Sequence, residues 1–286
     1  MKVILSPNPY RDKGMTAVRA AERILKDSGI ECSICLPFKP DEAFKLPQDM
    51  TVRDIHSEIK TADMLISFGG DGTILHSARL ARTHDIPILG VNLGSVGFMA
   101  ELEVSELNQL TRLAEGKYTC ESRMMLDVRI IRDGRSIFHD TTLNDVAITK
   151  GAMARVIDIA VFGDRVKIME YSGDGVIVAT PTGATAYSMS AGGPIVEPTA
   201  ENIIITPICA HDLLTKSIVL GKERLVDIKV GHLARKSAYL SADGGRAFRL
   251  SSGDIVELRA SNQKIRLVRM TGRSFYEILN QKLARG

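Results

Sequence analysis

Residues 64–75 read MLISFGGDGTIL, an apolar run followed by a glycine-rich turn and the start of a second apolar segment. The run Met64–Phe68 predicts a buried strand, and Ile74–Arg82 has the spacing of a helix. Glycine permits backbone conformations and close approaches that other residues cannot make, so the turn lets the chain pass directly into a helix that starts near Thr73. A strand, a tight turn and a helix in this order are the repeating unit of parallel α/β sheets.

The same alternation extends to about residue 116. Further strands are expected at VILSP, ECSICLP and IPILGVN, and further helices at Thr16–Ser28, Val52–Lys60 and Ser105–Glu115. We therefore expect an α/β N-terminal domain, with a parallel sheet flanked by helices.

From about Cys120 the chain changes to short runs rich in Val and Ile, separated by turns of the Asp-Gly, Gly-Asp or Ser-Gly type. MLDVRIIRDGRSIF and VIDIAVFGDRVKIM are two such stretches. This pattern predicts an all-β, sandwich-like second domain, interrupted by one short helix near Thr185–Ala191. The final segment, Ser274–Leu283, returns to helical spacing and is expected to pack back on the first domain.

Two domains follow from this division. Residues 1–118 and 270–286 are expected to form the α/β domain that carries GGDGT. Residues 119–269 are expected to form a β-rich domain that binds a ligand of its own.

Composition excludes several classes of function. The 286 residues are 44% hydrophobic and 25% charged, as in ordinary globular proteins, and the net charge of +3 predicts neither a nucleic-acid nor a membrane partner. The N-terminal MKVILSPNPY is too short in apolar residues for a signal peptide, so a cytoplasmic location is expected. Cys32 and Cys35 have CxxC spacing, but on a strand their side chains would point to opposite faces, so we expect buried structural thiols.

Asp71 lies at the centre of the glycine turn and raises a chemical question. A helix N-terminus offers N–H groups and partial positive charge to an anion such as phosphate, whereas a carboxylate repels phosphate. The turn matches neither the Walker A pattern nor GxGxxG. Because N–H donors favour the charged carboxylate, we expect Asp71 to be ionised and able to accept a proton or bind a cation. The alternative is that Asp71 only caps the helix, a role that Thr73 could also fill.

A second glycine turn, NLGSVGF at residues 92–98, directly follows the fourth strand. Ligands of open α/β sheets bind at the carboxyl ends of the strands, so the two turns are expected to converge on one crevice. The alternative is a sharp turn that leads into the second domain.

The β-rich half contains two candidate stretches. In LNDVAI, Asn144 stands beside a carboxylate before an apolar strand, where it could read an adenine edge or ribose hydroxyls or simply form an Asn-Asp turn. Residues 173–194, GDGVIVATPTGATAYSMSAGGP, collect hydroxyl and N–H donors around glycine turns and contain neither Lys nor Arg. Such a polar pocket suits a sugar-nucleotide better than a bare polyphosphate.

The combination of this stretch with GGDGT and NLGSVGF resembles the NAD kinase family, from about Asp63 to Leu283. GGDGT alone is less specific, because lipid kinases of the diacylglycerol type share it. The resemblance implies phosphoryl transfer from ATP, or from polyphosphate in some members, to the 2′-hydroxyl of the adenosine ribose of NAD. It also implies a divalent cation such as Mg²⁺, an α/β domain followed by a β-sandwich-like domain with the substrate between them, and a homodimer or homotetramer.

The resemblance also implies site residues, which are assigned by matching the motifs of this sequence to those of the family. Asp71 matches the catalytic aspartate, with Gly72 beside the substrate, and Asn144 and Asp145 match a pair that contacts adenosine. The segment that lines the NAD site corresponds to Thr185, Ala186, Tyr187, Ser188, Met189 and Ser190.

Three further residues have looser counterparts. Asp174 matches a substrate-contacting aspartate that reaches a neighbouring subunit's site in some relatives. His76 and Arg155 occupy positions where relatives often have a polar or basic NAD contact.

The chain also departs from the family pattern. Ala184 replaces the Ser of TPTGSTAY, and Gly245 stands where many relatives have Gln.

The resemblance predicts a Mg²⁺-dependent NAD kinase in which Asp71 takes the hydroxyl proton. The alternatives are a lipid kinase that shares GGDGT, and a nucleotide sensor that binds NAD or NADP without turnover.

Overall fold

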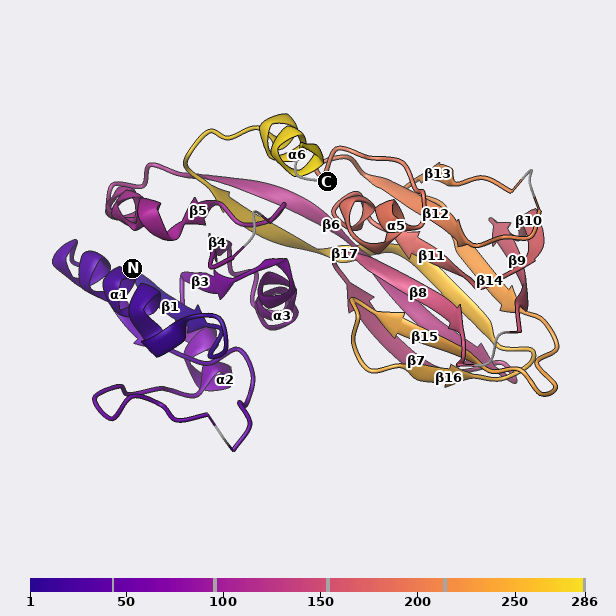
Figure 1. Cartoon of the computed structure of the whole chain (residues 1–286), viewed down its shortest axis with the longest axis horizontal. Coiled ribbons are helices and arrows are strands. Elements are labelled where there is room, and N and C mark those ends of the chain that lie inside the picture. The colour runs from indigo at the N-terminus through magenta and orange to yellow at the C-terminus, as the bar shows by residue number, and fades with distance from the viewer. Residues whose placement is uncertain (43, 95–96, 153–154, 213–214, 285–286) are drawn as a thin grey trace. The chain divides into compact units, whose positions relative to one another are not determined.

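The computed structural model of the chain describes residues 1–42, 44–94, 97–152, 155–212 and 215–284. Contacts among these residues divide the chain into two units, Met1–Ser122 with Lys264–Gly286, and Arg123–Gln263 (Figure 1). The boundaries fall inside two long strands, β6 (Thr119–Arg132) and β17 (Ile255–Arg269). Each unit has a core of its own buried side chains.

The first unit is built on a parallel sheet in the strand order β2-β1-β3-β4. The strands are β1 (Lys2–Pro7), β2 (Glu31–Ile34), β3 (Met64–Gly69) and β4 (Ile88–Asn92). Leu5 lies opposite Ile66, and Ser67 lies opposite Gly90. Strand β3 is buried along its whole length, which is why it reads as an unbroken apolar run. The predicted parallel sheet is confirmed, and a short strand β5 (Leu102–Glu103) pairs with β4.

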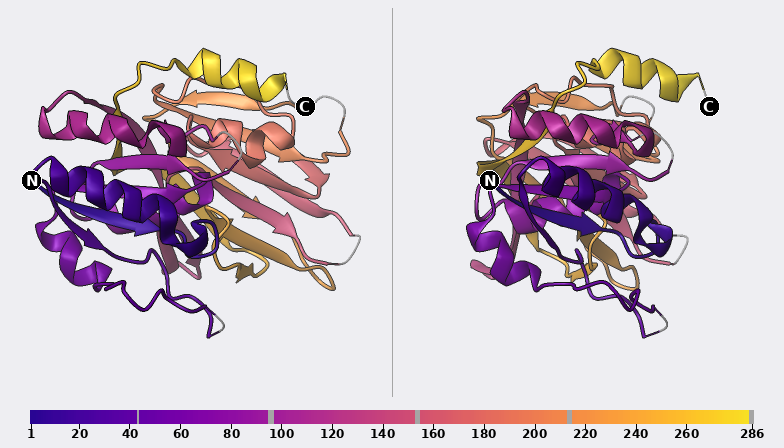
Figure 2. Two further views of the ribbon diagram at one scale, coloured as in Figure 1. Left: turned by 60° about the vertical axis from the view of Figure 1, so that its left-hand side comes forward. Right: turned by 90° about the vertical axis from the view of Figure 1, so that its left-hand side faces the viewer.

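Helices accompany this sheet in the first unit. They are α1 (Thr16–Asp27), α2 (Ile55–Glu58), α3 (Asp71–Ala81), α4 (Thr111–Ala114) and α6 (Phe275–Leu283). Helix α1 lies beside strand β1 (Figure 2). It buries Val18, Ala21 and Leu25 in the same core as the sheet residues. It ends before Gly29, whose φ of +76° is the left-handed conformation that commonly stops a helix.

Helix boundaries in this unit differ from the sequence expectation. Helix α2 starts only at Ile55, because Asp54 caps it by accepting a hydrogen bond from the backbone N–H of Ser57 at 2.9 Å. The helix expected at residues 105–115 is mainly a 3-10 helix, Val104–Leu110, followed by the short α4.

The second unit consists of antiparallel sheets. One has the order β13-β12-β11-β8-β15-β16, and another part of the unit contains the order β10-β9-β14-β17 and the hairpin of β6 with β7. The remaining strands are β7 (Arg135–Thr142), β8 (Asp145–Lys150), β9 (Ile157–Gly163), β10 (Val166–Gly173), β11 (Gly175–Ala179), β12 (Asn202–Ile208), β13 (Ile218–Gly221), β14 (Val226–Val230), β15 (Ala238–Ala242) and β16 (Phe248–Leu250).

The core of the second unit takes side chains from both sets of strands. Val128, Ile159 and Ile228 pack in one cluster with Val176 and Ile203 of the six-stranded sheet. This arrangement is the predicted sandwich-like domain. The β6–β7 turn at Asp133-Gly134 has positive φ at both residues, as the Asp-Gly sequence predicts.

Strand β11 is buried on both faces, because a second, smaller cluster covers the side of the sheet that faces away from the main core. Ala184 belongs to that smaller cluster together with Ile177 and Ile204. The segment after β11 folds onto this face as a 3-10 helix, Gly183–Thr185, and the short helix α5 (Tyr187–Ser190). The motif with the densest hydroxyl groups is therefore packed directly on the sheet.

The C-terminal helix α6 packs on the first unit, as expected. The ring of its residue Phe275 lies 6.1 Å from that of Phe98, between centroids. Ser274 caps the helix, accepting from the N–H of Glu277, whose carboxylate in turn accepts from the N–H of Ser274.

None of the helices in the described ranges has the length and apolar character needed to cross a membrane.

Candidate active site

Asp71 is the first residue of helix α3, directly beyond the carboxyl end of β3. Gly70 occupies the N-cap position in an extended conformation, and its carbonyl accepts a hydrogen bond from the N–H of Thr73 at 2.9 Å. Gly69 has no room for a side chain, since a Cβ there would lie 2.2 Å from Oγ1 of Thr73. Gly69 therefore permits the close approach of Thr73, and the helix begins two residues earlier than the sequence pattern indicates.

The carboxylate of Asp71 is held by the second glycine turn. Oδ2 accepts a hydrogen bond from the backbone N–H of Phe98 at 2.9 Å, and Oδ1 accepts one from that of Met99 at 3.1 Å. Gly97 lies against the same carboxylate, and a Cβ on it would lie 2.3 Å from Oδ1. These donors belong to a loop 27 and 28 residues further along the chain, and not to α3 itself. The side chain also does not cap the helix.

The two glycine turns are joined by backbone contacts at the carboxyl ends of β3 and β4. The N–H of Leu93 donates to the carbonyl of Gly69 at 3.0 Å. The Asn92 side chain donates to the carbonyl of Gly94 and to the Glu103 carboxylate, each at 3.1 Å. The predicted convergence of these turns is therefore present, while Ser95 and Val96 of NLGSVGF lie outside the described residues.

Gly72 and His76 follow Asp71 on exposed positions of α3. The ring of His76 packs against Phe38, with 5.4 Å between centroids, and Phe38 stacks in turn on Tyr10. Although His76 is exposed overall, partial desolvation of its ring and the nearby Arg79 lower its pKa below the usual value, which favours the neutral imidazole. This cluster of Tyr10, Phe38 and His76 was not predicted from the sequence, because its members come from three separate segments of the chain.

Asn144 and Asp145 are buried at the start of β8, with 8% and 6% of their surfaces exposed. The Asp243 carboxylate fixes their turn by accepting from the N–H groups of Leu143 at 2.9 Å, Asn144 at 2.7 Å and Asp145 at 3.2 Å. It also accepts from the hydroxyl of Thr142. Asp243 was not predicted as a site residue, although an aspartate at the end of a strand and before two glycines indicates a turn that its side chain can stabilise.

The turn leaves two groups in unusual states. Burial, and secondarily the charge of Asp243, raises the pKa of Asp145 from 3.8 to about 7. The amide oxygen of Asn144 is buried and has no hydrogen-bond partner among the described residues. A buried acceptor without a partner is costly, so this oxygen is suited to receive a donor from a ligand.

The hydroxyl-rich segment packs against the same turn. The hydroxyl of Thr180 donates to the carbonyl of Leu143 at 2.5 Å and accepts from the N–H of Gly183 at 3.1 Å. A Cβ on Gly183 would lie 2.0 Å from the carbonyl oxygen of Asn144, so only glycine permits this approach. The segment and the Asn144 turn thus form one continuous surface within the second unit.

The six predicted residues of this segment differ in availability. Thr185 and Ser188 are buried, and their hydroxyls bond to the carbonyl of Thr182 at 3.3 Å and to the hydroxyl of Thr206 at 2.8 Å. Ala186 and Met189 are half-buried, whereas Tyr187 and Ser190 are exposed. Tyr187 is therefore an exposed side chain that can meet a ligand, the hydroxyl of Ser190 donates to the carbonyl of Ala186 at 3.5 Å, and Ser188 serves mainly to fix the segment.

Asp174 and Arg155 lie at other positions of the second unit. Asp174 forms an ion pair with Lys150 at 2.8 Å, and both side chains are about one-third exposed. Arg155 is exposed and directly follows Met153 and Ala154, which lie outside the described residues.

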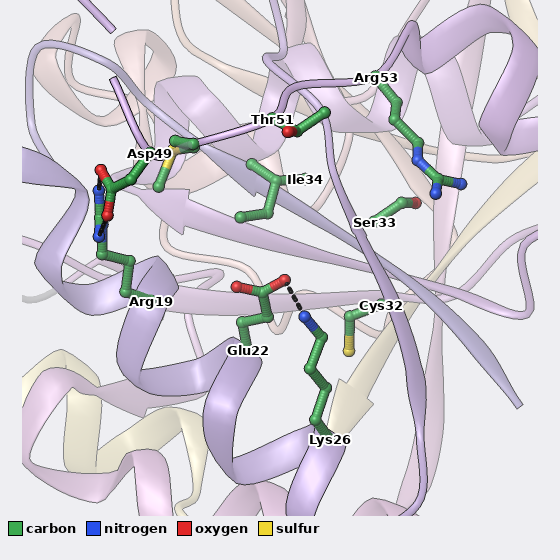
Figure 3. A pocket seen from close by; sticks show the side chains of 10 residues that line it. Arg19, Glu22, Lys26, Cys32, Ser33, Ile34, Asp49, Thr51 and Arg53 are labelled. Atoms are coloured by element: carbon green, nitrogen blue, oxygen red, sulfur yellow. Dashed lines mark hydrogen bonds and ion pairs between the residues drawn. The ribbon is translucent and has the colours of Figure 1, made fainter. Parts of the chain in front are cut away.

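A separate pocket of about 420 Å³ lies between α1, β2 and residues 49–53 (Figure 3). Its charged groups are already paired, Arg19 with Asp49 at 2.5 Å and Lys26 with Glu22 at 2.7 Å. Cys32 also lines it, and burial raises the pKa of this thiol and of Cys35 to about 11, which keeps both protonated at neutral pH. The pocket contains none of the predicted site residues.

Comparison with known proteins gives matches over both units. Residues 3–118 match the ATP-NAD kinase N-terminal domain, and residues 143–270 match the ATP-NAD kinase C-terminal domain.

The NAD kinase of Acetivibrio thermocellus is 35% identical over 284 residues, covering 99% of this chain and 97% of that protein. The NAD kinase of Natranaerobius thermophilus is 38% identical over 287 residues, with the same two coverages.

Two solved structures resemble the chain over 99% of its length. Yeast NADH kinase complexed with NADH has a TM-score of 0.86 and 26% identity, with 87% of that chain covered. An NAD kinase from Archaeoglobus fulgidus in complex with ATP has a TM-score of 0.74 and 25% identity, with 99% of that chain covered.

Proposed function

The chain belongs to the NAD kinase family and is an NAD kinase, and we propose that Asp71 accepts the proton of the 2′-hydroxyl group that the enzyme phosphorylates. The acceptor is the adenosine ribose of NAD, and the donor is ATP. Family membership over nearly the whole chain decides against the lipid kinase and against a sensor without turnover.

The observation that carries this role is the fixed yet accessible carboxylate of Asp71. Two backbone N–H groups hold its oxygens at 2.9 and 3.1 Å, and the residue is only partly buried. Each carboxylate oxygen can accept a further hydrogen bond, so a substrate hydroxyl can approach without breaking either contact. A general base must lie within hydrogen-bond reach of the proton that it removes, and a preorganised carboxylate meets that need.

The transfer then follows the usual course of phosphoryl transfer. As the 2′-oxygen bonds to the γ-phosphorus of ATP, Asp71 takes the hydroxyl proton, and the bond from the γ-phosphorus to the β,γ-bridging oxygen breaks. ADP leaves with that electron pair, and NADP is formed. Positioning and charge neutralisation supply most of the acceleration in such reactions. The exposed first turn of α3, at Gly72, offers N–H groups to the phosphates.

We propose that Mg²⁺ assists by neutralising phosphate charge. No cluster of three His, Cys, Asp or Glu side chains suited to a metal ion occurs in the described part of the chain. Mg²⁺ in kinases is usually bound by one or two carboxylates together with the substrate's phosphates, so a site without a protein-only cage fits this ion. Asp71 is the carboxylate in the glycine turn that could contribute.

We propose that the NAD-binding residues lie in the second unit. The unpaired amide oxygen of Asn144 suits the adenine amino group or a ribose hydroxyl, and the exposed ring of Tyr187 suits stacking. Asp145, Asp174, Arg155 and the segment from Thr185 to Ser190 complete the set proposed for the second unit. Gly72 and His76 are proposed as further NAD contacts and belong to the first unit. The functional domains are proposed to span residues 1–118 with 270–286, and residues 119–269.

A cytoplasmic homodimer or homotetramer is proposed from the family resemblance. Sedimentation velocity of the purified protein tests the subunit number. Polyphosphate as an alternative donor is tested in the assay below.

The decisive experiment measures NADP formation by the wild type and by Asp71→Asn, with ATP or polyphosphate and with Mg²⁺ or EDTA. We expect Asp71→Asn to lower kcat by about 10²–10⁴-fold, the usual contribution of a general base. An Asp71→Asn variant with the wild-type kcat would exclude the proposed role. Diacylglycerol is included as a control acceptor and should remain unphosphorylated.

A further inference from the structure

We propose that Phe275 and Lys282 of helix α6 are positioning residues for the reaction, which act on Asp71 through the ring of Phe98. The inference rests on the proposed role of Asp71 as the proton acceptor. All of the residues concerned belong to the first unit.

The orientation of the Asp71 carboxylate depends on the loop that ends at Met99. Its two hydrogen bonds come from the backbone N–H groups of Phe98 and Met99, and the first turn of α3 does not hold the carboxylate. Any shift of this loop therefore moves the donors that orient the base.

The ring of Phe98 is held from the side of α6. Phe98 is only 8% exposed. The ring of Phe275 lies 6.1 Å from it at an interplanar angle of 41°, and Nζ of Lys282 lies 4.3 Å from the ring centroid. These distances are typical of aromatic pairing and of cation–π contacts. Phe275 and Lys282 lie two helical turns apart on α6, so they contact the ring from two points along the helix.

A cavity lies between described residues of the loop region and helix α6. It has a volume of about 370 Å³ and is lined by Gly94, Gly97 and Ala100 of the loop region and by Ile278 and Gln281 of α6. Dense packing is what normally fixes a segment, so with a void here the loop is positioned by the Phe98 contacts and by Arg269, whose Nη1 donates to the carbonyl of Met99 at 3.3 Å.

Helix α6 is a fixed point against which the ring can be held. The buried carboxylate of Glu101 accepts from the N–H groups of Met270 at 2.7 Å and Thr271 at 2.6 Å, and an ion pair joins it to Arg269 at 3.2 Å. These bonds tie the segment that leads into α6 to residues just beyond the Asp71-binding loop. The entry of the helix is thus set independently of the contacts that Phe275 and Lys282 make.

The test compares Phe275→Ala, Phe275→Leu and Lys282→Met with Asn280→Ala, an exposed position on the same helix. Steady-state kinetics with NAD and ATP give kcat and KM, and NMR hydrogen exchange follows the amides of Phe98 and Met99. We expect kcat to fall about tenfold or more in Phe275→Ala and Lys282→Met, with KM changed less than twofold, because small displacements of a catalytic group are costly. Phe275→Leu should recover part of kcat, and the two amides should exchange faster in the variants with reduced kcat.

Asn280→Ala should retain the wild-type kcat and exchange rates. A folded Phe275→Ala and Lys282→Met with wild-type kcat would overturn the inference, as would a rise in KM alone. If Phe275→Ala does not fold, Phe275→Leu and Lys282→Met decide the question by the same criteria.

The Asp71→Asn background separates this inference from the proposed function. When Asp71 is already replaced, Phe275→Ala should lower the residual rate less than twofold, because residues that act through one group are not additive. An equal tenfold loss in both backgrounds would show a general structural effect and overturn the inference. A wild-type kcat in Asp71→Asn would instead overturn the proposed function.

Discussion

Gly97 lies so close to the carboxylate of Asp71 that a Cβ on it would be 2.3 Å from Oδ1. The glycine is therefore needed for the adjacent N–H groups of Phe98 and Met99 to reach both carboxylate oxygens.

We expect Gly97→Ala to lower kcat by about 10–100-fold, because the methyl group must displace either the carboxylate or the loop. KM for NAD should change little. Gly94→Ala is the matched control, since its Cβ would meet only the flexible end of Arg11 at 3.4 Å. Equal activity of the two variants in the NADP assay would contradict this account.

Gly183→Ala is expected to destabilise the second unit by about 1–3 kcal/mol, the usual cost of inserting a methyl group where there is no space. Its Cβ would lie 2.0 Å from the carbonyl oxygen of Asn144, a backbone atom that cannot rotate away. Urea unfolding followed by circular dichroism measures the change, and an unchanged midpoint would contradict the prediction.

Asp145→Asn should stabilise the protein in a pH-dependent way. The pKa of Asp145 is raised to about 7 in the folded state, above its ordinary 3.8, so the folded state retains a proton that the unfolded state has lost. The protonated carboxyl thus contributes stability that is complete below pH 4 and is lost as pH rises through 7. We expect the variant to exceed the wild type by about 2–4 kcal/mol at pH 8 and by much less at pH 4.5. Unfolding curves at the two pH values measure this, and an equal difference at both would contradict it.

Asp243→Asn is expected to cost about 1–3 kcal/mol at pH 8, because the carboxylate accepts three backbone hydrogen bonds and one from a hydroxyl, which a single amide oxygen cannot replace. The same change removes the charge that repels Asp145, so the pH window of Asp145 should move lower. It should not return to the ordinary value, because burial is the larger cause. The pH dependence of unfolding in Asp243→Asn checks both expectations.

The sequence was sufficient to predict the fold class of each half of the chain and the convergence of the two glycine turns. Apolar runs and glycine turns identified strand β3, helix α3 and the second turn at residues 92–98, because these signals are local. It could not predict that Phe98 and Met99 hold Asp71, or that Asp243 holds the Asn144 turn about 100 residues away. Such contacts depend on tertiary packing between distant segments, which produces no periodic pattern in the sequence.

The start of α3 illustrates the same limit. The glycine turn predicts a helix that starts near Thr73, with Thr73 as one possible cap, but the helix begins at Asp71. The hydroxyl of Thr73 instead accepts from the Asn8 side chain at 3.0 Å, and Asn8 follows strand β1. The hydroxyl of Thr73 is therefore bonded to a residue that is distant in the sequence, which local sequence patterns do not reveal.

The buried amide oxygen of Asn144 has a consequence for selectivity. While it lacks a donor, the ligand-free protein carries a desolvation cost of about 1–3 kcal/mol, and only a ligand with a correctly placed N–H or O–H relieves it. A dinucleotide with an acceptor at that place would leave two oxygens facing each other. The amide oxygen of Asn144 would then discriminate between purine dinucleotides of nearly equal size. It would do so by penalising a dinucleotide with an acceptor at that place more than by rewarding one with a donor.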